Sequence, residues 1–174
     1  MASTRRPPPS YGDFHIDALS VNAAVRPEHL VGMGFRRALT ALETGDQSSW
    51  EFAWQQFANA AGECKATELV ARLSCWTRAV RRCSGRRIET LPPGCPGFCR
   101  DECLAIAMIA ASQHSVCPAL KACAFVLMGS SRIETALETA DAFGASLSQS
   151  GQILSAQSVC NALAFDAHPK TRAC

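Results

Sequence analysis

Apolar residues recur at intervals of three and four over most of the chain between residues 27 and 165, which is the period of an α-helix. No stretch alternates apolar and polar side chains at period two, so the pattern predicts neither a β-sheet nor a βαβ nucleotide-binding fold. Glycines at 45, 62, 85 and 129 divide the helical pattern into segments. The sequence therefore predicts an all-α protein, a compact bundle of about six or seven helices.

Three helices are predicted in the first half of the chain. The first begins at Pro27, a residue suited to the first helical position, and ends at residue 44. The second begins at Asp46 or Ser48, either of which can cap a helix, and ends near Gly62, with its aromatic residues expected in the core. The third is expected to begin at Thr67 and to end near residue 85.

The second half begins with a rigid connector at residues 91–97, which hold three prolines and two glycines. Residues 99–111 and 118–129 are apolar on nearly all sides, which indicates buried helices, and we expect them to form a buried apolar central hairpin. Ser131 and Glu134 fit a capping box for a short helix that ends near residue 142. A last helix is expected from residue 148 or 150 to about 165.

The residues Thr-Ala-Leu-Glu-Thr occur twice, at 40–44 and at 135–139, each time with Met-Gly five residues before. This similarity is compatible with a duplicated helical hairpin and equally with chance in a sequence rich in Ala, Leu and Glu.

The length of 174 residues fits one domain with a core of its own. We expect an irregular N-terminal arm at 1–25, a single helical domain at 26–167 and a C-terminal tail at 168–174. Residues 103–128 could span a bilayer as one helix, but Gln113, His114 and Pro118 interrupt them, so no membrane span is expected. The start of the chain resembles no signal peptide, so the ten cysteines are predicted to be reduced in an intracellular, cytoplasmic protein.

Five arginines fall within ten residues of a chain whose net charge is only +2. At the end of a helix, arginines interact favourably with the helix dipole, and clustered arginines also suit an acidic protein surface or a phosphate backbone. Because the overall charge lacks the excess of a dedicated nucleic-acid binder, nucleic acid is not the favoured ligand. The predicted partner-binding residues are Arg78, Arg81, Arg82, Arg86 and Arg87.

The densest group of thiols carries a second interpretation. Cys99 and Cys103 are one helical turn apart, and thiolate and imidazole are the ligands that zinc and copper(I) prefer. The other interpretation is that these are small buried residues, since unpaired cysteine is commonly buried. The candidate metal ligands are Cys95, Cys99, Cys103, His114 and Cys117.

No serine-hydrolase elbow, phosphate-binding loop or zinc-protease motif occurs, and the four histidines are scattered. We therefore predict a non-enzymatic protein that needs no cofactor and acts as a helical interaction or assembly protein, a scaffold, adaptor or structural subunit. Its partner is expected to be another protein or a second copy of itself. The alternative is a thiolate protein that binds zinc or copper.

Overall fold

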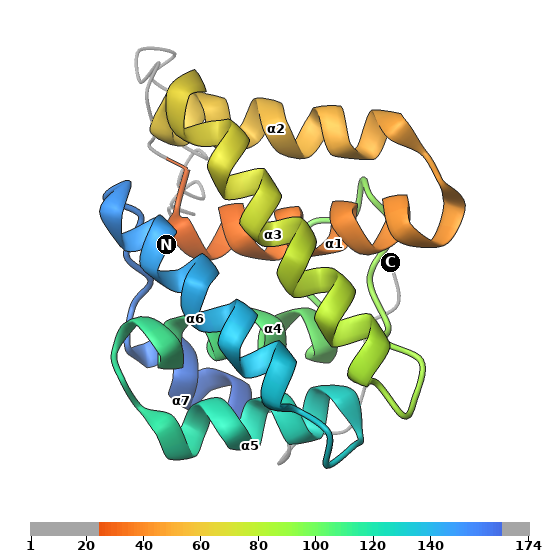
Figure 1. Ribbon diagram of the computed structural model, residues 1–174, viewed down its shortest axis with the longest axis vertical. Helices are drawn as coiled ribbons and strands as arrows, with labels where there is room; N and C mark the ends of the chain where they lie inside the picture. Colours follow the sequence, from red (N-terminus) through yellow and green to blue (C-terminus); the bar gives the residue numbers. More distant parts are fainter. Residues whose placement is uncertain (1–24, 165–174) are drawn as a thin grey trace, which may run out of the picture.

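The computed structural model describes residues 25–164, and within this range the chain forms seven α-helices and no strand (Figure 1). The prediction of an all-α bundle is confirmed. The predicted arm and tail lie outside the described residues. The helices are α1 (Pro27–Thr44), α2 (Gln47–Ala61), α3 (Glu63–Cys83), α4 (Arg100–Gln113), α5 (Cys117–Met128), α6 (Glu134–Gln149) and α7 (Gln157–Ala164).

The first two helices begin and end where their residues dictate. Pro27 opens α1, and Gly45 ends it in the left-handed conformation, with φ of 73°. The Asp46 side chain accepts a hydrogen bond from the backbone N–H of Ser48 at 3.0 Å and so caps α2. The third helix starts four residues earlier than predicted, directly after Gly62. Thr67 is therefore an internal residue of α3, where its hydroxyl accepts a hydrogen bond from Trp54 at 3.3 Å.

Two predictions about α6 are wrong. Ile133 stands at its N-cap position without any side-chain cap, so Ser131 and Glu134 form no capping box. The helix also runs past residue 142 to Gln149, because Gly144 lies against α4, where an added Cβ would come within 3.0 Å of the Ser112 hydroxyl. Glycine at this position allows close contact between two helices instead of ending one. The last helix begins correspondingly later than predicted.

The most deeply buried helix is α4, whose residues 104–111 are all buried. It contacts α1, α5, α6 and α7, and α5 beside it completes the predicted apolar hairpin. The buried face of α5 includes Leu120 and Leu127, whereas Phe125 is 55% exposed. Figure 1 shows α3 and α6 side by side across one broad face, with α2 at one end of the molecule and α5 at the other.

Three aromatic rings from different helices meet in the core. Trp76 of α3 is fully buried, with its ring centroid 5.2 Å from Phe35 of α1 and 5.6 Å from Phe143 of α6. The aromatic residues of α2 were predicted to be buried, and this is wrong for Phe52, which is 42% exposed and lies under the Arg37 guanidinium at 4.1 Å. Because α2 contacts only α1 and α3 closely, one of its sides faces outward.

The two Thr-Ala-Leu-Glu-Thr segments occupy different contexts. Residues 40–44 are the last turn of α1, and the Met-Gly before them lies inside the same helix. Residues 135–139 are the first turn of α6, and the Met-Gly before them ends α5. The repeated letters therefore mark no repeated hairpin. Among residues 25–164, none of the helices combines the length and the apolarity that crossing a bilayer requires.

Candidate functional site

Four of the five predicted binding arginines present their guanidinium groups without an ion pair in the described part of the chain. Arg78, Arg81 and Arg82 lie in the last turns of α3, and Arg87 lies in the connection that follows. All four are exposed. Arg78 donates to the Ser74 hydroxyl at 3.2 Å, and Arg81 donates to the Leu42 carbonyl, where it satisfies an open acceptor at the end of α1.

Arg86, the fifth, is engaged within the molecule. Its guanidinium donates two hydrogen bonds to the carboxylate of Asp101, at 2.7 and 2.8 Å, and Asp101 itself is only 5% exposed. A third hydrogen bond reaches the Val126 carbonyl of α5 at 3.3 Å. This bidentate ion pair raises the pKa of Arg86 above its ordinary value. Arg86 therefore fastens the connection after α3 to α4 and α5.

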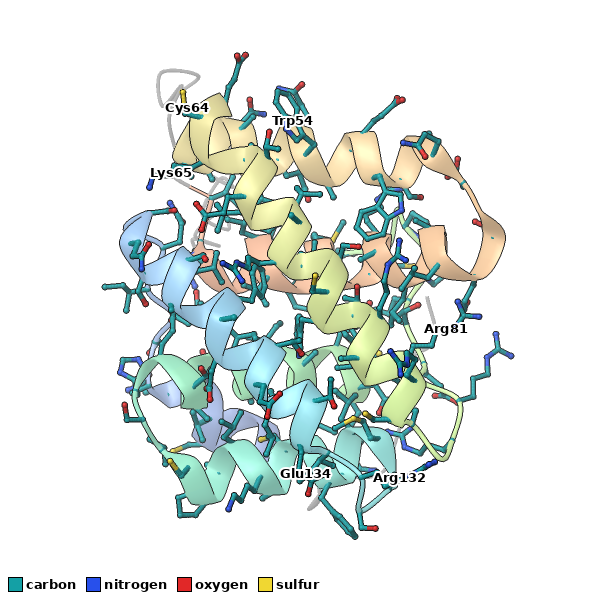
Figure 2. All side chains as sticks on the ribbon, viewed as in Figure 1. Trp54, Cys64, Lys65, Arg81, Arg132 and Glu134 are labelled. Atoms are coloured by element: carbon teal, nitrogen blue, oxygen red, sulfur yellow. The ribbon has the colours of Figure 1, made fainter. Side chains whose placement is uncertain are left out.

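The remaining arginines lie on different sides of the α3 end. Arg82 borders an open hollow of about 220 Å³ between α3 and the start of α6, together with Arg132 and Glu134. Arg81 and Arg87 border another, of about 210 Å³, beside the end of α1. Figure 2 shows Arg132 and Glu134 at the start of α6 and Arg81 apart from them. Arg132 was not among the predicted binding residues, because only the packing of α6 on α3 brings it near Arg82.

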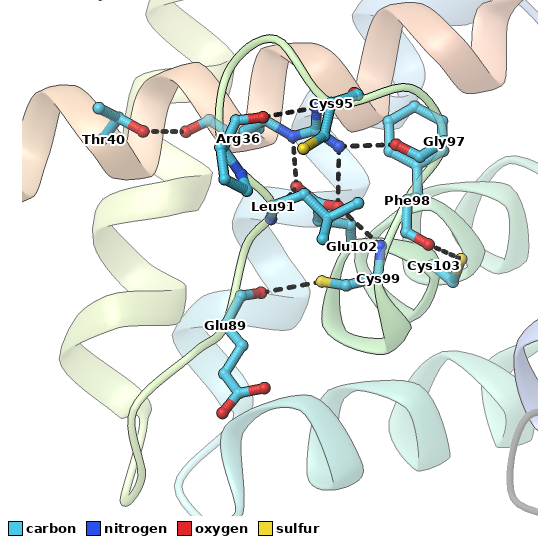
Figure 3. Close-up of polar contacts among 11 residues, drawn as sticks. Arg36, Thr40, Glu89, Leu91, Cys95, Gly97, Phe98, Cys99, Glu102 and Cys103 are labelled. Carbon is cyan, nitrogen blue, oxygen red and sulfur yellow. Dashed lines mark hydrogen bonds and ion pairs between the residues drawn. The ribbon is translucent and has the colours of Figure 1, made fainter. Parts of the chain in front are cut away.

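A buried arginine was also missed. Arg36 of α1 and Glu102 of α4 are both fully buried and form an ion pair in which Arg36 Nε donates to Glu102 Oε1 at 2.6 Å (Figure 3). A second bond joins Arg36 Nη2 to Glu102 Oε2 at 3.0 Å. The other guanidinium hydrogens point to the connector between α3 and α4, where they bond to the carbonyls of Cys95 at 2.9 Å and Gly97 at 2.7 Å.

Glu102 accepts two further hydrogen bonds from the same connector. The backbone N–H of Cys99 donates to it at 2.8 Å and that of Leu91 at 3.3 Å. Glu102 is the third residue of α4 and Cys99 its N-cap, so the capping box of this molecule lies here. The Pro/Gly-rich connector is thus held in place by one buried ion pair.

The candidate metal ligands divide between the two ends of α4. Cys95, Cys99 and Cys103 lie around its start, whereas His114 and Cys117 follow its end, and a helix of 14 residues is roughly 20 Å long. His114 Nε2 is hydrogen-bonded to the Leu154 carbonyl at 2.8 Å. Within residues 25–164, no three His, Cys, Asp or Glu side chains are grouped so that they could hold a metal ion. The five predicted ligands therefore do not assemble into one site.

The thiols at the start of α4 lie in surroundings that disfavour the thiolate. The Cys99 thiol donates to the Glu89 carbonyl at 3.2 Å, and the Cys103 thiol lies 4.0 Å from the Phe98 carbonyl (Figure 3). Burial raises the pKa of Cys99 to about 11, and burial together with the charge of Glu102 raises the pKa of Cys103 to about 11. Burial also raises the pKa of Cys123. None of the nine cysteines in the described range forms a disulfide.

These environments predict selective alkylation by iodoacetamide at neutral pH. Cys64, Cys75, Cys117 and Cys160 are exposed and are expected to react fast, whereas Cys99, Cys103 and Cys123 should react at least about tenfold more slowly, because the thiolate is the nucleophile. Peptide mass spectrometry after timed quenching measures each site. Equal rates at Cys99 and Cys117 in the folded protein would contradict the assigned environments.

The same pKa values predict how stability depends on pH. Because the folded pKa of Cys99 and Cys103 exceeds the ordinary value of 9, their contribution to the free energy of unfolding should be lost as the pH rises from 9 to 11.

A hollow of about 340 Å³ opens between the end of α4, the start of α5 and α6. It is lined by a mixture of polar and apolar side chains, and across it Ser112 donates to Asp141 at 2.6 Å. Cys117 lies at its edge. No histidine lines this hollow, so it brings together no cysteine–histidine pair of the kind that activates a nucleophile.

Comparison with known proteins gives no functional assignment, because no protein-family model, no curated protein and no solved structure matches this chain.

Proposed function

We propose that this chain is a non-enzymatic helical protein-interaction or assembly module that binds a partner protein through the arginines around the end of α3. Arg78 and Arg82 are the main contacts, Arg132 extends the surface beside Arg82, and Arg87 adds a contact on the side of the same helix end that faces α1. The partner surface offers carboxylates, which arginine binds in bidentate geometry. An intracellular, cytoplasmic location belongs to the proposal and is supported by the described cysteines, which form no disulfide.

One observation carries the proposal: exposed guanidinium groups are concentrated around the end of α3 without carboxylate partners in the described part of the chain, while Arg36 and Arg86 are paired with buried carboxylates. Internal pairing accounts for Arg36 and Arg86, whereas no carboxylate within residues 25–164 forms an ion pair with Arg78, Arg82 or Arg87. Arginine is also enriched in protein–protein interfaces compared with the rest of the surface. The raised pKa values of Cys99 and Cys103, which disfavour a nucleophilic thiolate, further favour an interaction protein over an enzyme.

The test is affinity capture from an extract of the source cells with a triple variant, R78A/R82A/R87A. Arg81 is kept because it satisfies the end of α1. A matched control removes three exposed cations elsewhere, R26A/K65A/K121A. We expect the triple variant to lose at least one captured protein about tenfold relative to wild type, and the control to retain it, as measured by quantitative mass spectrometry.

Both variants should keep the wild-type far-UV circular dichroism, since all six side chains are exposed. An identical set of captured proteins for wild type, triple variant and control would remove the arginines from the proposed function.

A further inference from the structure

The helices α3 and α6 lie antiparallel on one broad face of the molecule (Figure 1). At one end, Arg82 near the end of α3 and Glu134 at the start of α6 border the same hollow. At the other end, the Ser146 hydroxyl of α6 donates to Glu68 of α3 at 3.1 Å. The two contacts are 14 residues apart on α3 and 12 on α6, so the helices stay level with each other over about four turns.

The outward sides of these two helices carry opposite charges. Arg78 and Arg82 are exposed on α3, and Glu134 and Glu138 are exposed on α6. None of the four forms an ion pair within residues 25–164, where the ion pairs are Arg36–Glu102 and Arg86–Asp101. Each pair of charges is four residues apart, which is about 6 Å along a helix. The antiparallel arrangement places Arg82 level with Glu134 and Arg78 level with Glu138.

We propose that this α3–α6 face binds a second copy of the chain in a symmetric dimer. A two-fold axis that runs between the helices and parallel to them turns the arginines of one copy towards the glutamates of the other. Arg82 of each copy then meets Glu134 of its partner, and Arg78 meets Glu138, so that each pair forms twice. The inference rests on the proposed function and names its partner.

The middle of the face permits the close approach that such a dimer needs. Along α3 it presents Ala71 and Cys75, and along α6 it presents Ala142 and Ala145, none of which is buried. These short side chains leave the longer arginines and glutamates as the outermost groups of the face.

The charge pattern favours a second copy over other occupants. A nucleic acid would approach the arginines but would be repelled by the two glutamates, which lie at the same level about one helix spacing, 8–10 Å, away. A uniformly acidic protein would meet the same repulsion. A surface that holds both signs at equal spacing is complementary to a second copy of itself. With the two-fold axis parallel to the helices, each arginine of one copy faces a glutamate of the other.

Two charge-reversal variants test the dimer by sedimentation velocity at low ionic strength. R78E/R82E reverses the charge of the two arginines of the face, and E134R/E138R reverses that of its two glutamates. We expect wild type to sediment as a concentration-dependent dimer and each variant alone to associate about 100-fold more weakly or worse, because like charges then face each other. An equimolar mixture of the two variants should form dimers again, since every reversed pair is restored between unlike copies.

A control variant, R26E/K121E, carries the same net charge change as R78E/R82E at exposed positions off this face and should dimerise like wild type. Circular dichroism of each variant establishes that it is folded before mixing. A wild-type chain that stays monomeric at all concentrations, or folded variants whose mixture stays monomeric, would overturn the dimer. Arginine-dependent capture of a different protein would then leave the proposed function standing, whereas failure of both experiments would remove it.

Discussion

Glu102→Ala is expected to lower the free energy of unfolding by about 3–5 kcal/mol, because it leaves the Arg36 guanidinium as a buried charge without a counterion. Both side chains of the pair are fully buried, so water cannot replace the lost carboxylate without opening the contact between α1 and α4. The backbone N–H groups of Cys99 and Leu91 lose their acceptor in the same variant. Urea unfolding followed by circular dichroism measures the loss.

A control and a double variant sharpen this result. Glu51→Ala removes an exposed carboxylate from α2 and should change the free energy of unfolding by less than about 0.5 kcal/mol. The double variant R36M/E102L should recover much of the stability lost in Glu102→Ala, since removing both members of a buried pair avoids the unpaired charge. A loss for Glu102→Ala no larger than that for Glu51→Ala would show that the pair does not hold these elements together.

Trp76→Ala is expected to destabilise the protein by about 3–5 kcal/mol, because it opens a large cavity between three helices. The Trp76 ring contacts Phe35 of α1 and Phe143 of α6, so the truncation removes contacts to both neighbours. Its indole N–H has no hydrogen-bond partner in the described part of the chain. The loss is therefore one of packing, and Trp76→Phe, which keeps a ring there and removes the unpaired N–H, should be much milder.

Trp54 provides the matched comparison for the same measurement. It is a partly exposed tryptophan of α2, and its contact to α3 includes one hydrogen bond to Thr67 at 3.3 Å. Trp54→Ala is expected to cost about 1 kcal/mol. Equal losses for Trp54→Ala and Trp76→Ala in urea unfolding would mean that Trp76 is not the centre of the core.

Most of the fold could be predicted from the sequence because the signals that define these helices are local. The apolar period of 3.6, Pro27 at a helix start and Gly45 at a helix end depend only on neighbouring residues. The errors in the predicted helix ends occurred where a contact with a residue distant in the sequence determines the structure. The helix predicted to end near residue 142 continues to Gln149, and within it the lack of a Cβ at Gly144 allows α6 to pack closely on Ser112. Thr67 resembles a helix cap, yet it bonds to Trp54 of another helix.

The candidate sites were less predictable for the same reason. A cluster of arginines is visible in the sequence, but which of them is paired depends on Asp101, which lies 15 residues beyond Arg86. The burial of Arg36 was not predictable from its position, since an arginine on an amphipathic helix ordinarily points to solvent. Its partner Glu102 lies in the first turn of the helix predicted from residue 99, but only the tertiary fold shows that this carboxylate binds a cation from α1.

The ion pair between Arg36 and Glu102 also sets an order of events during synthesis on the ribosome. The two residues are 66 positions apart, so at about 5–20 residues per second several seconds pass between their additions to the chain. By the end of that interval α1, α2 and α3 have been made, but α4, which also packs against α1, is still missing. The N-terminal half of the nascent chain therefore cannot complete its core alone, and the fold closes only after residue 102 has left the exit tunnel.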